Sequence, residues 1–177
     1  MLTPGPLRFR DATEADLEDL LALVTSAYRG DASRVGWTTE ADLLDGERID
    51  REVLLADMRQ PRSRVLLAER GDALLACAHV AELGGGGYFG MFAVRPERQG
   101  GGLGKQVLAE AERVVRDEWG LACLRMTVID VRDELIAWYQ RRGYHRTGIV
   151  KPFPYGDARF GIPRRDDLRF EVLEKNL

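Results

Sequence analysis

The sequence has few of the features that place a chain in a specialised class. Its 177 residues include two cysteines, Cys77 and Cys123, which lie in apolar runs and lack the spacing of metal ligands. We expect both to be reduced and buried in a cytoplasmic protein, with no metal. No apolar run approaches the length that crosses a bilayer, and Pro4 and Pro6 interrupt the segment where a signal peptide would lie.

Excess positive charge is also missing. The net charge is −3 and basic residues form no run, which argues against nucleic acid or a membrane surface as a partner. The composition of 45% apolar and 31% charged residues is typical of a globular protein with a sizeable core. We therefore expect a single domain over residues 1–177, with monomer and homodimer both open.

A glycine-rich turn is the most informative stretch that is present. It follows the apolar run 91–94 and leads into a helical pattern that begins near residue 103. Helix N-termini carry unpaired N–H groups, and glycine lets the backbone approach a ligand closely, so this order predicts an anion site. The alternative is a glycine-rich connection that binds nothing. The turn consists of Arg98, Gln99, Gly100, Gly101, Gly102, Leu103, Gly104 and Lys105.

Two common phosphate-binding patterns do not fit this turn. A P-loop requires glycine five residues before Gly104 and Ser or Thr after Lys105, but the chain has Gln99 and Gln106 there. The dinucleotide fingerprint requires glycine or alanine where Val107 stands. A nucleotide-binding enzyme that uses this turn is therefore disfavoured.

The spacing Gln99-x-x-Gly102-x-Gly104 instead resembles the pyrophosphate-binding turn of the GNAT superfamily of N-acetyltransferases. The stretch from Trp138 to Tyr144 resembles that family's second recurring motif. The resemblance implies acetyl-CoA as co-substrate, its diphosphate on residues 98–105, and Tyr139 as general acid toward the leaving thiolate. It also implies a strand whose backbone holds the pantetheine arm and polarises the thioester carbonyl; its residues are Phe92, Ala93 and Val94.

The sequence departs from the family pattern at two places. Arg132 replaces the Asn that commonly contacts pantetheine, so Arg132 contacts the coenzyme in another way or is an exposed residue at a helix start. No carboxylate occupies the strand before the turn, which leaves His79 and Glu82 as candidate general bases. The alternatives are a hydrogen-bonded histidine in a sheet, a solvated glutamate, and a water chain that removes the proton.

The acceptor is expected to be a small-molecule or peptide amine bound by loops. In the family the segments near residues 28–44 and 152–157 flank the acceptor entrance. Residues with aromatic or charged side chains could form such a site, although the aromatic ones could equally cover the end of the sheet. The candidates are Tyr28, Arg29, Trp37, Phe153 and Tyr155.

The periodicity along the chain predicts an α+β fold, with mixed α/β connections. Strands are expected at 7–10, 64–69, 73–81, 88–94, 124–128, 144–149 and 168–173, with a hairpin turn at Gly71-Asp72. Helices are expected from Thr13 to Gly30, from near Asp50 to just before Pro61, over 103–118 and over 135–141. This order resembles the GNAT fold: a mostly antiparallel twisted sheet of about six to seven strands with one parallel βαβ crossover, flanked by about four helices.

Three functional hypotheses follow. The first is an acetyl-CoA-dependent N-acetyltransferase in which the amine attacks the thioester directly. No nucleophile elbow is present, and neither cysteine is placed near the expected site, so a covalent acyl-enzyme is not expected. The second is an inactive coenzyme-A-binding module that acts as a sensor. The third, a nucleotide-binding enzyme, is weakened by the two failed patterns.

Overall fold

The computed structural model describes residues 5–28, 44–45, 51–98, 101–153, 162–163 and 166–177. The strands are β1 (Arg8–Asp11), β3 (Ser63–Arg70), β4 (Ala73–Leu83), β5 (Gly86–Val94), β6 (Cys123–Ile129), β7 (His145–Pro152) and β9 (Arg169–Asn176). They form one seven-stranded sheet in the order β1-β3-β4-β5-β6-β9-β7. Two further short strands, β2 (Leu44–Asp45) and β8 (Ile162–Pro163), pair only with each other.

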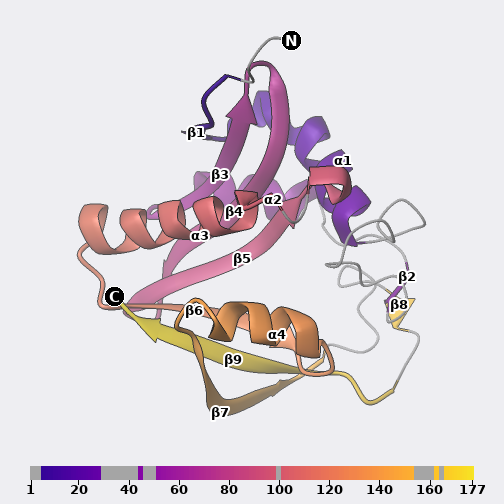
Figure 1. The fold of residues 1–177 in the computed structure, drawn as a ribbon, viewed down its shortest axis with the longest axis vertical. Helices are drawn as coiled ribbons and strands as arrows, with labels where there is room; N and C mark the ends of the chain where they lie inside the picture. Colours follow the sequence, from indigo (N-terminus) through magenta and orange to yellow (C-terminus); the bar gives the residue numbers. More distant parts are fainter. Residues whose placement is uncertain (1–4, 29–43, 46–50, 99–100, 154–161, 164–165) are drawn as a thin grey trace.

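The helices lie on both faces of this sheet (Figure 1). They are α1 (Leu17–Tyr28), α2 (Arg51–Arg59), α3 (Leu103–Arg113) and α4 (Asp133–Gln140). All strand pairs in the sheet are antiparallel except β5 with β6, which α3 connects as a βαβ crossover. The α+β prediction, including its single parallel pair, is confirmed.

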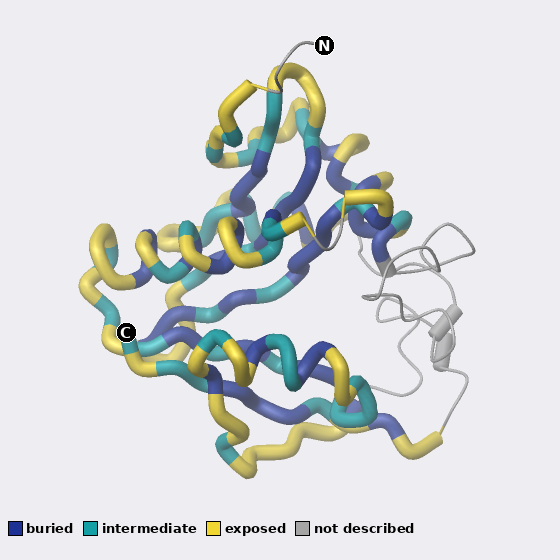
Figure 2. The backbone as a smooth tube through the Cα atoms, viewed as in Figure 1, coloured by how far each residue is buried: buried dark blue, intermediate teal, exposed yellow. Residues whose placement is uncertain are grey.

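Strand alternation divides the core into two layers. On β3, Val65 and Leu67 pack in a cluster with α1 and α2, whereas Leu66 and Ala68 pack in a cluster with α3 and α4. Because successive side chains of a strand point to opposite faces, a continuous apolar run is what a strand buried on both faces requires. Figure 2 shows that β3 and β4 are buried through their middle and β5 along most of its length, while the edge strand β7 is exposed.

Polar contacts fix the start of α1. A 3₁₀ turn over Glu14–Asp16 precedes the helix, and the Asp16 carboxylate accepts a hydrogen bond of 2.8 Å from the backbone N–H of Thr13. Arg10 donates two hydrogen bonds of 2.8 Å to the same carboxylate. The Arg10 guanidinium and the Thr13 N–H together lower the pKa of Asp16 to about 2. This corner therefore fixes β1 against the first helix.

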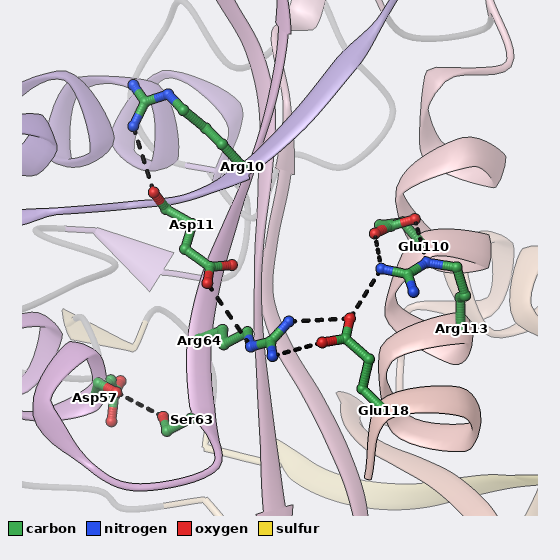
Figure 3. Close-up of polar contacts among 8 residues, drawn as sticks. All are labelled: Arg10, Asp11, Asp57, Ser63, Arg64, Glu110, Arg113 and Glu118. Atoms are coloured by element: carbon green, nitrogen blue, oxygen red, sulfur yellow. Dashed lines mark hydrogen bonds and ion pairs between the residues drawn. The ribbon is translucent and has the colours of Figure 1, made fainter. Parts of the chain in front are cut away.

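An ion-pair network ties the edge of the sheet to the end of α3 (Figure 3). Arg64 on β3 donates to Glu118 at 2.8 and 3.2 Å, and Arg113 also reaches Glu118 at 2.9 Å. Asp11 lies 3.7 Å from Arg64, and Glu110 accepts from Arg113 at 2.7 Å. The helix continues through a π-helical turn over Val114–Glu118, so the expected helix over 103–118 is present but changes its winding after Arg113.

Candidate functional site

The parallel strands β5 and β6 are joined at one end only. Their paired residues are Gly87 with Leu124 and Tyr88 with Arg125. Beyond Tyr88 the two strands diverge, with α3 along one arm and α4 along the other (Figure 1). Gly87 permits this junction, because a Cβ atom there would lie 2.6 Å from a methyl group of Val115. β5 is therefore separated from β6 along the stretch that leads to the glycine-rich turn.

A β-bulge lies on β5 just past the junction. Cys77 pairs with Ala93 and His79 pairs with Gly90, so Met91 and Phe92 together oppose the single residue Ala78. Met91 has a φ of 47°, in the left-handed region that a side chain seldom adopts. Bulges of this kind remove a residue from the hydrogen-bond ladder and turn the backbone, and they recur beside active sites. The sequence pattern over residues 88–94 did not predict this bulge.

Helix α3 begins directly after a glycine. Gly102 is the N-cap, has a φ of 84° and provides no side-chain hydrogen bond, and no acidic residue occupies the first helical turn. A Cβ atom on Gly102 would contact nothing within 4 Å, whereas one on Gly104 would lie 3.1 Å from the Phe92 ring and 3.2 Å from the Trp138 ring. The first turn is therefore packed closely from inside and open at its tip, where its N–H groups favour an anion.

Aromatic side chains connect this helix end to Tyr139. Phe92 on β5 packs against Trp138 on α4 with ring centroids 5.8 Å apart, and Trp138 packs against Tyr139 at 5.2 Å. Tyr139 also meets Phe89 on β5 at 6.5 Å and is 4% exposed. The Tyr139 side chain thus extends from α4 to β5. Its acid role stays a prediction.

The two candidate bases lie at different levels of β4. Glu82 pairs with Gly87, beside the β5–β6 junction, and its carboxylate accepts a 2.8 Å hydrogen bond from Arg62. His79 pairs with Gly90, two residues beyond the last β5–β6 pair, and its ring meets Tyr88 edge to face at 5.8 Å. The register therefore favours His79 over Glu82 as the group nearer the divergence.

His79 has two partners that sequence reasoning missed. Its Nε2 atom lies 2.8 Å from Ser63 Oγ, and its Nδ1 atom lies 3.7 Å from the Asp57 carboxylate. Burial lowers the pKa of His79, and the facing carboxylate partly offsets this. Burial also raises the pKa of Asp57, against the effect of His79. No local signal marked Asp57, because it sits near the end of α2 and is brought to His79 only by folding.

Other predicted residues divide into three groups. Arg98 and Lys105 are exposed beside the turn, and Arg132 is the N-cap of α4. Leu103, Ala93 and Val94 are buried core residues, and Phe153 is 5% exposed in a cluster with Ile129 and Leu168. Several predicted positions lie outside the described residues or, at Tyr28, outside the described side chains: Tyr28, Arg29, Trp37, Gln99, Gly100 and Tyr155.

The short pair of β2 and β8 was not predicted. It joins residues 44–45 to residues 162–163 in antiparallel register. β2 begins at the end of the first segment that was expected to flank the acceptor entrance, residues 28–44, and β8 lies past the end of the second, residues 152–157. The pairing therefore joins the chain just after one segment to the chain beyond the other, although residues from each segment lie outside the described part of the chain.

The geometry fits the diphosphate of coenzyme A. An uncapped helix end with a glycine at positive φ provides N–H donors without a side chain in the way, and Gly104 admits the close packing that holds the turn. Within the described ranges, no three His, Cys, Asp or Glu side chains are placed to hold a metal ion. None of the helices in those ranges is both long and apolar enough to span a membrane.

Comparisons with known proteins show what the whole chain is similar to. A family model described as "Acetyltransferase (GNAT) family" matches residues 18–144. The ribosomal-protein-alanine N-acetyltransferase of Brucella melitensis has a TM-score of 0.70 at 23% identity, covering 96% of this chain and 99% of that one. The ribosomal-protein-S18-alanine N-acetyltransferase of Escherichia coli has a TM-score of 0.70 at 13% identity, covering 97% and 94%.

A spermidine N-acetyltransferase chimera from Vibrio cholerae and hSSAT is also similar, with a TM-score of 0.68 at 14% identity over 96% of this chain and 95% of that one. No curated protein matches the sequence. These structural likenesses show the fold. The family match covers most of the chain, and the protein belongs to the GNAT acetyltransferase family.

Proposed function

We propose that this chain is an acetyl-CoA-dependent N-acetyltransferase, one catalytic domain over residues 1–177, that acetylates a primary amine of a small molecule or peptide in the cytoplasm. The observation that carries the proposal is one chain of contacts. It runs from Gly104 through Phe92 and Trp138 to Tyr139, and so joins the helix end to the tyrosine that the family resemblance assigns as the general acid.

Each part of this arrangement has a task in the proposed reaction. When bound, the coenzyme supplies the acetyl thioester, and the first turn of α3 would hold its diphosphate. The bulge at Met91–Phe92 would direct a backbone N–H toward the thioester carbonyl. The Tyr139 hydroxyl would donate a proton to the departing sulfur, and Arg98, Lys105 and Arg132 would contribute charge at the turn.

The first experiment tests the coenzyme site by calorimetry. Gly102→Glu places a carboxylate at the open tip of α3, and we expect it to weaken acetyl-CoA binding by about 100-fold or more, since like charges in contact cost several kcal/mol. The matched control is Gly85→Glu in the β4–β5 turn, where φ is 80° and the surroundings are equally open. Equal affinity in both variants would refute the placement of the diphosphate.

The second experiment tests the acid. Tyr139→Phe should lower kcat by about 100-fold while the KM for acetyl-CoA changes little, because the phenol acts only on the leaving group. Thiol release with a panel of amines and peptide N-termini is the measurement. Tyr144→Phe is the control, since Tyr144 is also buried and donates a 2.9 Å hydrogen bond to Glu112. Full activity of Tyr139→Phe would leave Tyr139 as a packing residue.

The competing hypothesis is a coenzyme-A-binding module without turnover. The absence of a carboxylate on β5 and the replacement at Arg132 favour it. The same panel decides between the two, because a sensor would bind acetyl-CoA in the calorimeter but release no thiol with any amine.

A further inference from the structure

Asp57, Ser63 and His79 form a polar cluster on the α1–α2 face of the sheet, which the proposed reaction has not used so far. They come from α2, β3 and β4, and Figure 3 shows the contact that joins Asp57 to Ser63. The spacing resembles a serine–histidine–aspartate arrangement, with Ser63 Oγ 2.8 Å from His79 Nε2 and Asp57 2.6 Å from the same hydroxyl through its backbone carbonyl.

The donors of this cluster determine the histidine tautomer. A carbonyl oxygen can only accept, so the Ser63 hydroxyl must donate its one proton to the Asp57 carbonyl. Ser63 Oγ must then accept from His79, which places a proton on Nε2. A hydroxyl whose proton is committed to a carbonyl is not activated as a nucleophile, so the cluster is not a hydrolytic triad.

The second ring nitrogen is left facing a carboxylate. With Nε2 protonated, neutral His79 presents the lone pair of Nδ1 to Asp57, whose oxygen lies 3.7 Å away. The carboxylate favours a proton on Nδ1 while burial opposes it, so the ring is neutral and its Nδ1 lone pair is available to accept a proton. The His79 side chain is 12% exposed and the Asp57 side chain 27%, so this proton would be held largely away from water.

Two described cations near this pair have carboxylate partners of their own. On α2, Arg59 donates to Glu14, and at the start of β3, Arg62 donates to Glu82 on the same strand as His79. The remaining titratable neighbour is Tyr88 on β5, whose ring packs against His79. The described cations nearby thus pair with other carboxylates.

The cluster lies at the level of the β5–β6 divergence. His79 pairs with Gly90, and the Tyr88 hydroxyl lies 2.4 Å from the point where a Cβ atom of Gly90 would stand. The phenol therefore fills the place of a side chain at residue 90, two positions beyond the last β5–β6 pair. The polar groups of this face meet at the same level as the bulge.

We propose that His79 and Asp57 form a proton-binding site for the acetyl transfer, with Asp57 as a positioning residue that holds His79 ready to take the proton of the acceptor amine. This inference rests on the proposed function. In the step, the amine N–H bond breaks, its electron pair stays on nitrogen, and the proton passes to Nδ1 of His79, directly or through water. The amine nitrogen would form a bond to the acetyl carbon, and the carbon–sulfur bond would break with its electron pair left on sulfur. The thiolate is protonated separately by Tyr139.

The first test uses ring ¹⁵N NMR of the free protein. The chain has two histidines, and His145 on exposed β7 serves as the internal reference. We expect neutral His79 as the Nε2–H tautomer. In Asp57→Asn it should titrate at lower pH, because the carboxylate that favours its charged form is gone. Asp72→Asn in the exposed β3–β4 turn should change nothing. An Nδ1–H tautomer, or an unchanged titration in Asp57→Asn, would overturn the proton site.

The second test uses the pH profile of kcat/KM with the best amine from the panel. In Asp57→Asn the acid limb should move to lower pH by the same interval as the NMR titration, with a loss of about 10-fold at neutral pH. A uniform loss at every pH would mean a structural role and would overturn the catalytic one. If the wild-type protein transfers no acetyl group, the proposed function fails and this catalytic role with it, while NMR still decides the proton site.

Discussion

The two faces of β5 differ beside the β5–β6 divergence. On the α3–α4 face, Phe89 and Phe92 pack against Trp138 and Tyr139 in a cluster of apolar and aromatic side chains. On the α1–α2 face, Tyr88 and the small residue Gly90 stand beside the polar cluster of His79. One strand thus separates an apolar layer that carries the proposed acid from a polar site that carries the proposed base.

This difference shows how the fold can serve two proton transfers without mixing them. A group that protonates a thiolate and a group that deprotonates an ammonium need opposite environments, and groups in separate environments can hold different pKa values. The sheet keeps them apart because alternate side chains of β5 belong to different layers. Variants that change one face should leave the properties of the other largely intact.

The largest expected effect comes from breaking the apolar face. Phe92→Ala should lower the free energy of unfolding by about 3–5 kcal/mol, as for other buried phenylalanines, measured by urea denaturation. Phe89→Ala is the control, because Phe89 is also buried on this face but Gly104 packs against Phe92. Both variants should lose stability, and only Phe92→Ala should weaken acetyl-CoA binding beyond that loss. Equal affinity in the two would mean that Phe92 does not position the helix end.

A smaller effect is expected on the polar face. Gly90→Ala inserts a methyl group 2.4 Å from the Tyr88 hydroxyl, so the phenol must turn away. Because that hydroxyl is the far end of a rotatable side chain, we expect stability to change by about 1 kcal/mol or less. The His79 ring signals should shift as Tyr88 moves, while the Trp138 signals stay in place. Unmoved His79 signals would contradict the contact between these rings.

The layers themselves could be predicted from the sequence. The apolar runs of β3 and β4 on either side of Gly71-Asp72 indicated a buried hairpin, and the structure has it. The parallel pair of β5 and β6 followed from strand, glycine turn, helix and strand in that order, and it is confirmed. These features depend on local periodicity and on short turns, which a single sequence records well.

The bulge on β5 could not be predicted, although it decides which residues share a face. Simple alternation from Phe89 would place Met91 and Ala93 on the same side. The extra residue instead places Phe92 and Val94 with Phe89, and moves Met91 and Ala93 to the α1–α2 cluster. Met91 takes a positive φ without being glycine, so its identity gives no signal.

The polar cluster escaped prediction for a different reason. His79 was noticed for its chemistry, but Asp57 and Ser63 lie in a helix and at the start of another strand. Their approach depends on how α2 packs on the sheet, which no spacing in the sequence records. Glu82, the rival base, was equally plausible until its pairing with Gly87 placed it beside the junction.

The smallest expected effect is a pH-dependent change in stability that belongs to the polar face. Burial lowers the pKa of His79 from its ordinary 6.5, so the unfolded chain binds a proton before the folded chain does. The stability due to neutral His79 is complete above pH 6.5 and is lost as the pH falls through the folded pKa. Asp57 acts with the opposite sign. Its raised pKa stabilises the fold below its ordinary 3.8, and this stability is lost as the pH rises through the folded value.

His79→Gln separates these two contributions. The wild type should lose stability relative to the variant as the pH falls below 6.5, because the buried imidazole resists protonation in the folded chain. Urea denaturation at several pH values measures this difference. Phe89→Ala supplies the contrast, since no titration is involved and its loss should stay constant over the same range. If the wild type and His79→Gln gave parallel curves, His79 would carry no proton-linked stability and the two faces would not differ in this respect.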